Sequence, residues 1–96
     1  LSPMNLTPVA VFRLGRIVAT PALLERVTHE DIIAAIARHQ AGDWGDLDAE
    51  DRTTNNEALI HGGRLLSVYR TAQGVKFYLI TEADRSVTTA LLPEDY

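Results

Sequence analysis

The chain has 96 residues, of which 46% are hydrophobic and 23% are charged, with 13 acidic side chains against 9 basic ones. This length and composition suit one globular domain, residues 1–96, with a modest core. The net charge of −4 disfavours nucleic-acid binding, which normally uses a basic stripe, and the absence of cysteine excludes disulfides and thiolate metal sites.

The chain carries no sign of a membrane segment. No apolar stretch approaches the roughly 18 residues that span a bilayer, and the first residues lack the pattern of a secretory signal. We therefore expect a cytoplasmic protein without membrane contact. Leu1–Pro3, in front of Met4, is interpreted as a vector remnant and is excluded from the fold prediction.

The first predicted element is a strand over Val9–Ala19, in which alternate residues are apolar. A short helix should follow, because Thr20 is a typical N-cap and Pro21 suits the first helical position.

Two further helices are predicted from their caps. The pattern of Thr28–Gly42 is helical, with Thr28 as N-cap and Gly42 just beyond the end. Asp48 should cap a third helix that ends at Gly62 or Gly63.

Three strands are predicted in the second half of the chain, with the sequences "RLLSVYR", "VKFYLIT" and "SVTTALL". Turns at Thr71–Gly74 and Ala83–Arg85 separate them, and Pro93 ends the last strand. The fold class is therefore α+β: an N-terminal strand, two to three helices, then a three-stranded antiparallel meander with the helices on one face. The core of the meander should include Leu66, Val68, Phe77 and Leu79.

The loop "HQAGDWGDLDAEDR" is rich in carboxylates, but their spacing does not match a calcium loop, so no metal and no cofactor is predicted. Trp44 is expected to be buried and to fix this loop to the core; the alternative is an exposed binding anchor. His39 lies near the end of its predicted helix, where an imidazolium would interact favourably with the negative end of the helix dipole, so a capping role is favoured over a catalytic one.

Polar side chains accumulate on the predicted meander. Asp84 should hydrogen-bond the backbone of its own turn, and Arg85 should pair with Glu82 or with a helix carboxylate. The polar residues exceed what turns require, so the meander is the candidate binding surface, although a solvated sheet face would have the same composition. The candidate binding residues are Trp44, Arg64, Tyr69, Tyr78, Glu82, Asp84, Arg85 and Thr88.

The segments "LGRIVATP", "GDWGDLDAEDR", "RLLSVYR" and "ITEADRSVTTALLPEDY" resemble a family of short bacterial proteins of plasmids and integrative elements, called plasmid-related proteins. Some members carry the name of a type I restriction subunit, which does not suit a chain this short and without a methyltransferase motif. The resemblance implies an accessory role in a mobile element and brings no catalytic residue.

The order of elements is also similar to that of RelE-, ParE- and barnase-like toxins, some of which cleave RNA without a metal. Such a ribonuclease would use Glu82 as base, with Arg64, Tyr69, Lys76 and Arg85 around the phosphate. The leading hypothesis is instead a non-enzymatic binding or regulatory protein with a protein partner, and a homodimer is left open.

Overall fold

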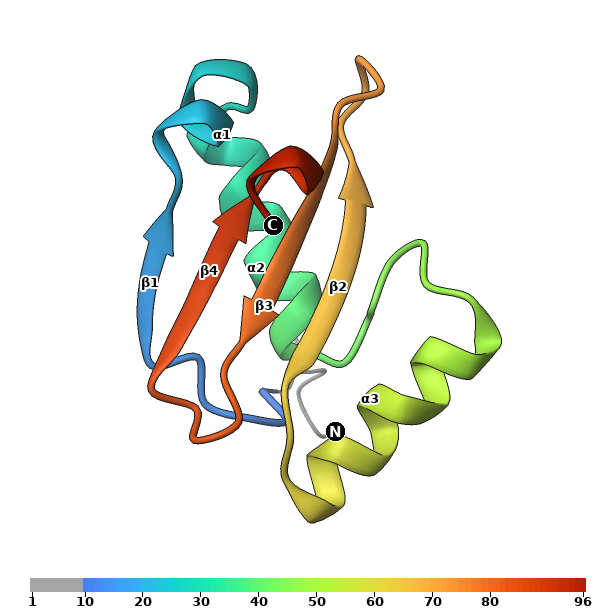
Figure 1. Cartoon of the computed structure of the whole chain (residues 1–96). Helices are drawn as coiled ribbons and strands as arrows, with labels where there is room; N and C mark the ends of the chain where they lie inside the picture. Colours follow the sequence, from blue (N-terminus) through green and yellow to red (C-terminus); the bar gives the residue numbers. More distant parts are fainter. Residues whose placement is uncertain (1–9) are drawn as a thin grey trace, which may run out of the picture.

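The computed structural model describes residues 10–96, which form a four-stranded sheet with helices around it (Figure 1). The strands are β1 (Arg16–Ala19), β2 (Leu65–Arg70), β3 (Lys76–Thr81) and β4 (Val87–Leu91). The helices are α1 (Pro21–Arg26), α2 (His29–Gln40) and α3 (Ala49–His61), followed by the 3-10 turn η1 (Pro93–Asp95). The predicted α+β class is confirmed, whereas the expected vector remnant and Val9 lie outside the described residues.

The sheet differs from the predicted meander in its number of strands and in their order, which is β1-β4-β3-β2. β2, β3 and β4 pair antiparallel in sequence, but β1 joins β4 in parallel, with Arg16 opposite Val87. The sheet is therefore mixed. The first strand is also shorter than predicted, because Gly15 has a φ of +65° and breaks the extended conformation before Arg16.

The helix caps follow the predictions. Thr20, Thr28 and Asp48 each accept a hydrogen bond from the backbone N–H three residues later, at the starts of α1, α2 and α3. Gly42 lies just beyond α2 with a φ of +84°, and Gly62 ends α3. None of the helices within residues 10–96 combines the length and the apolar character needed to cross a bilayer.

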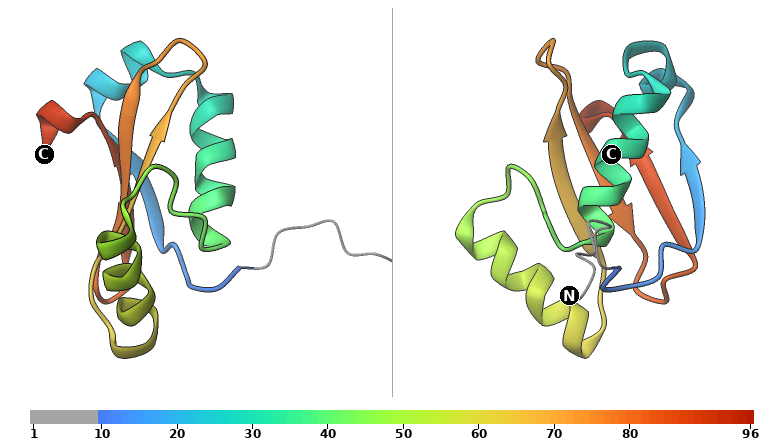
Figure 2. Two further views of the ribbon diagram at one scale, coloured as in Figure 1. Left: turned by 90° about the vertical axis from the view of Figure 1, so that its right-hand side faces the viewer. Right: turned by 180° about the vertical axis from the view of Figure 1, so that it is seen from behind.

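The helices do not share one face of the sheet as predicted (Figure 2). α2 covers one face, and α1 adds Leu23 to the core beneath it, together with Phe77, Leu79 and Ala90. α3 lies instead beside the edge of β2, and η1 lies on the side of the sheet opposite α2. The reason is that α3 is polar around most of its circumference and buries only Asn55 and Ala58.

A second, smaller core forms where the loop after α2 and helix α3 meet β2. Its buried residues are Trp44, Leu47, Ala58, Leu65 and Val68, with Leu66 partly buried against them. The prediction that Leu66, Val68, Phe77 and Leu79 contribute to the core therefore agrees with the structure, but the four residues divide between two clusters.

The outer edge of β2 is covered by side-chain and loop hydrogen bonds. The Asn55 amide donates to the Leu66 carbonyl (2.6 Å) and accepts from the Leu66 N–H (3.1 Å). Two residues further along β2, the Val68 carbonyl accepts from the Asp46 N–H (2.8 Å), and the Val68 N–H donates to the Trp44 carbonyl (3.1 Å). A further strand is thereby excluded from most of this edge.

Candidate functional site: the open face of the sheet

The face of the sheet opposite α2, called here the open face, carries one set of alternating side chains from each strand. Leu66 lies opposite Ile80, and Val68 lies opposite Tyr78, at the middle of this face. The same alternation places the exposed side chains of Arg70 and Lys76 at one end. No α-helix covers this set of residues (Figure 2), but η1 contacts β3. Val68 and Ile80 are buried at 7% and 6% exposure, so the accessible part of the open face lies at Leu66, Tyr78 and the charged side chains around them.

A groove with a volume of about 330 Å³ runs along this face. Its floor consists of Leu66, Val68 and Tyr78, and its acidic wall comes from the loop before α3 and the start of that helix. The opposite wall is formed by the C-terminal Tyr96, whose ring lies edge-on to Tyr78 with 6.1 Å between the centroids. The groove therefore combines an apolar, aromatic floor with polar walls.

Charges of both signs surround the groove. Arg70 pairs with Asp46 (3.3 Å) across one end, and the Lys76 ammonium lies 5.8 Å from the centre of the Tyr78 ring. At the other end of the open face, the Arg64 guanidinium binds the Glu82 carboxylate at 3.1 Å. Because these ion pairs are exposed, each contributes little to the stability of the fold. Their main effect is to fix the positions of the charged side chains on the open face.

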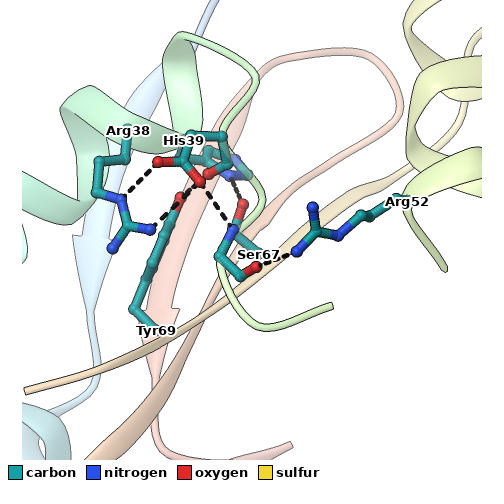
Figure 3. Close-up of polar contacts among 7 residues, drawn as sticks. Arg38, His39, Arg52, Ser67 and Tyr69 are labelled. Carbon is teal, nitrogen blue, oxygen red and sulfur yellow. Dashed lines mark hydrogen bonds and ion pairs between the residues drawn. The ribbon is translucent and has the colours of Figure 1, made fainter. Parts of the chain in front are cut away.

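The wall formed by the loop after α2 is fixed from several directions (Figure 3). Arg38 binds both carboxylate oxygens of Asp43 (2.7 and 3.2 Å), the Tyr69 hydroxyl donates to the Asp43 carbonyl, and Arg52 donates to the Gly45 carbonyl (2.9 Å). The hydrogen bond from Arg38 lowers the pKa of Asp43, and burial raises the pKa of Tyr69 to about 12. The loop is therefore held in place by the ionised Asp43 within it and by the neutral Tyr69 of β2.

On the covered face, under α2, a chain of polar groups links three strands. Thr88 donates to the Leu14 carbonyl (2.7 Å), and the Thr81 and Thr88 hydroxyls are 2.7 Å apart. The His39 ring lies between Thr81 (2.9 Å, Nε2) and Ser67 (2.5 Å, Nδ1).

The Leu14 carbonyl, at one end of this series of hydrogen bonds, determines the direction of the bonds as far as His39. A carbonyl only accepts, so Thr88 uses its proton on Leu14, Thr81 donates to Thr88, and His39 donates from Nε2 to Thr81. Because the ring is neutral near pH 7, Nδ1 carries no proton and accepts from the Ser67 hydroxyl. Burial, followed by the positive charge of Arg85, lowers the pKa of His39 to about 4. The predicted cationic helix cap at His39 is therefore wrong: the ring points into the core and is fully buried.

The turn between β3 and β4 is built by Asp84 and Arg85. Asp84 accepts from the Ser86 N–H (3.0 Å), as predicted for its own turn. Arg85, with a φ of +62°, does not pair with a carboxylate: it donates to the carbonyls of Gly63 (2.6 Å), Ala58 (3.0 Å) and Glu82 (3.1 Å). The guanidinium thus caps the C-terminal end of α3: it adds a second hydrogen bond to the Ala58 carbonyl, which also accepts from the Gly62 N–H (2.9 Å), and it binds Gly63 just beyond the helix.

The structure separates the candidate residues into three groups. Arg64, Lys76, Tyr78 and Glu82 share the open face; Tyr69 and Thr88 lie buried under α2; and Asp84 and Arg85 form the turn. Trp44 is 4% exposed and its Nε1 donates to Asn56 (3.1 Å), so it fixes the loop, as predicted, and is not an exposed anchor.

The hairpin register explains this separation. Tyr69 pairs with Phe77, so its ring lies on the covered face, whereas Lys76 and Tyr78 point to the other side. The five residues of the ribonuclease hypothesis therefore do not surround one point.

Sequence reasoning missed Asp46, Leu47 and Tyr96 as groove residues. Only the close contact of the Trp44–Asp46 loop with β2 and the return of the C-terminus bring them there, and neither leaves a local pattern. Within residues 10–96, no cluster of three or more histidine or acidic side chains is arranged to hold a metal. Comparison of the chain with protein-family models, curated proteins and solved structures gave no match.

Proposed function

We propose that this chain is a non-enzymatic binding protein that holds a protein partner on the open face of its sheet. The observation that carries the proposal is the groove in which Leu66, Val68 and Tyr78 form an apolar floor between acidic and basic rims. Protein interfaces typically combine such an apolar, tyrosine-containing centre with a polar rim. The acidic balance of the chain favours this partner over a nucleic acid.

The wider role proposed for the protein is that of a cytoplasmic accessory factor of a mobile genetic element. This part rests on the resemblance to plasmid-related proteins. It agrees with a site that offers shape and charge without a catalytic arrangement: Glu82 is paired with Arg64, and Arg85 is engaged with three carbonyls.

The test uses the whole chain as bait in its host extract, followed by direct titration of any captured protein. Tyr78→Ala removes the aromatic floor and Lys76→Glu reverses the charge at its rim, while Ile33→Ala alters an exposed apolar residue on α2, away from the groove. Circular dichroism first verifies that all variants fold. We expect both groove variants to weaken direct binding about tenfold or more, and Ile33→Ala to bind like the wild type.

Two results would contradict the proposal. One is a purified partner whose affinity does not change in either groove variant. The other is cleavage of free or ribosome-bound RNA by the purified chain that disappears in folded Glu82→Gln and Arg85→Ala variants, which would establish the ribonuclease instead.

A further inference from the structure

The two outer edges of the sheet differ in how their main-chain groups are satisfied. At β2, the Asn55 side chain and the Trp44–Asp46 loop bind the edge. At β1, the Arg16 N–H donates to the Ser86 carbonyl (2.9 Å) and the Thr20 N–H donates to the Ala90 carbonyl (3.0 Å). The main-chain groups of Ile17 and Ala19 therefore point away from β4.

Ile17 and Ala19 are the residues of β1 whose main-chain N–H and C=O groups point outward, away from the sheet. In a parallel ladder, every second residue directs both its N–H and its C=O toward the neighbouring strand, and the residues between direct theirs to the other side. Among residues 10–96, no strand pairs with this side of β1, which is the last strand of the sheet (Figure 1).

We propose that this edge binds a second copy of the chain. The two β1 strands would run antiparallel about a two-fold axis at Val18, joining two four-stranded sheets into one continuous sheet. The surface is separate from the open face, so the proposal stands independently of the partner proposed there.

The main-chain groups select this register. With Val18 opposite Val18 of the second copy, Ile17 faces Ala19 of the other strand twice, and each such pair exchanges two N–H to C=O hydrogen bonds. Every outward group of β1 is then used. A register centred on Ile17 would need Gly15 to extend the ladder, but the φ of +65° at Gly15 prevents this. A register centred on Ala19 would place Pro21, which has no N–H, opposite Ile17.

The side chains also fit a two-fold axis at Val18. The large Ile17 lies beside the small Ala19 of the other copy, and Arg16 lies beside Thr20, so no like charges face each other directly. Ile17 is 48% exposed, and Leu24, in the following helix α1, is 45% exposed. α1 turns from the end of β1 inward over β4 and leaves the edge uncovered (Figure 1).

A single-cysteine experiment tests the register, because the native chain has no cysteine. In the proposed dimer, the two Val18 Cβ atoms form a non-hydrogen-bonded pair about 4.5 Å apart, close to the range of a disulfide. Arg16 is separated from its own copy by four positions along the strands, or roughly 13 Å. We expect mild oxidation to convert Val18→Cys to a disulfide dimer and to leave Arg16→Cys monomeric, although Arg16 is the more exposed of the two.

Sedimentation of the unmodified chain over a roughly hundredfold range of concentration tests the dimer itself. We expect a monomer–dimer equilibrium that Ile17→Lys shifts about tenfold or more toward monomer, while Ile33→Lys, at another exposed isoleucine, leaves it unchanged. A chain that stays monomeric throughout would overturn the proposal. So would a dimer that is insensitive to Ile17→Lys, or equal cross-linking of the two cysteine variants.

Discussion

Asn55 binds Leu66 in the way a neighbouring strand would, with its side-chain amide donating to the carbonyl and accepting from the N–H of the same residue. The side chain is buried, at 3% exposure, and belongs to α3. One helical residue thereby satisfies the two groups of β2 that would otherwise be unpaired, and it positions α3 beside the sheet without a large apolar contact.

Asn55→Asp tests this relationship. A carboxylate still accepts from the Leu66 N–H but has no N–H for the Leu66 carbonyl, which it would repel. We expect a loss of about 2 kcal/mol in the free energy of unfolding, measured with urea. The neighbouring Asn56→Asp keeps the oxygen that accepts from Trp44 and lies exposed, so it should change stability by less than about 0.5 kcal/mol. Equal losses in the two variants would show that Leu66 needs no partner from α3.

The neutral His39 predicts a specific dependence of stability on pH. Its pKa falls from 6.5 to about 4 on folding, so the unfolded chain takes up a proton first as the pH falls. The free energy of unfolding should therefore decrease by about 3 kcal/mol between roughly pH 6.5 and pH 4, and this contribution should stay constant above that window. Urea unfolding at several pH values measures it.

His39→Gln is the matched variant for this measurement, because an amide can also donate and accept between Ser67 and Thr81 but does not titrate. The acidic side chains titrate in both proteins, so the difference between the two pH profiles isolates His39. Parallel profiles would mean that His39 does not carry the effect.

Arg85→Ala should loosen the end of α3. The variant removes a guanidinium that binds carbonyls of Ala58, Gly63 and Glu82, and such charged hydrogen bonds contribute about 2 kcal/mol. Hydrogen exchange should accelerate in the last turn of α3 and remain unchanged in α2. Arg26→Ala breaks only an exposed pair with Glu94 (3.6 Å) and should leave both helices as they are. Unchanged exchange in α3 would remove Arg85 from its role as a cap.

Gly45 and Gly74 offer a test of close backbone approach. Both have positive φ angles, +73° and +87°, so alanine is strained at either position by about 1 kcal/mol or more. A Cβ at Gly45 would also lie 2.0 Å from the Val68 carbonyl oxygen, whereas a Cβ at Gly74 meets nothing within 4 Å. Thermal unfolding should show a clearly larger loss for Gly45→Ala. A similar loss for both would indicate that the loop can move away from β2.

Local signals predicted much of the secondary structure, because caps and turns depend on neighbouring residues. Thr28, Asp48 and Asp84 make the hydrogen bonds that their positions suggested. Tertiary contacts decided the rest. The residues near His39 in the sequence do not indicate that its ring will bind Ser67 and Thr81. The alternation in β2 and β3 likewise does not determine which residues of the two strands pair with each other.

The candidate site likewise combines features that local sequence predicts with features that tertiary contacts determine. Lys76 and Tyr78 share a face because they are two residues apart on one strand, which strand alternation alone indicates. Their position relative to Tyr69 depended on hairpin register, and the contribution of Tyr96 depended on the path of the chain after β4. Neither can be read from a short window.

The parallel pairing of β1 with β4 has a consequence for synthesis on the ribosome. Among the strands of residues 10–96, β1 is the first to leave the exit tunnel, but its neighbour in the sheet, β4, is the last of them to be made. The two antiparallel hairpins of β2, β3 and β4 can form from nearby residues, whereas Arg16–Ala19 must remain hydrated until Val87–Leu91 emerges. A nascent chain halted before β4 would therefore expose β1 on both sides, and its four residues limit the length of strand that another unfinished chain could bind.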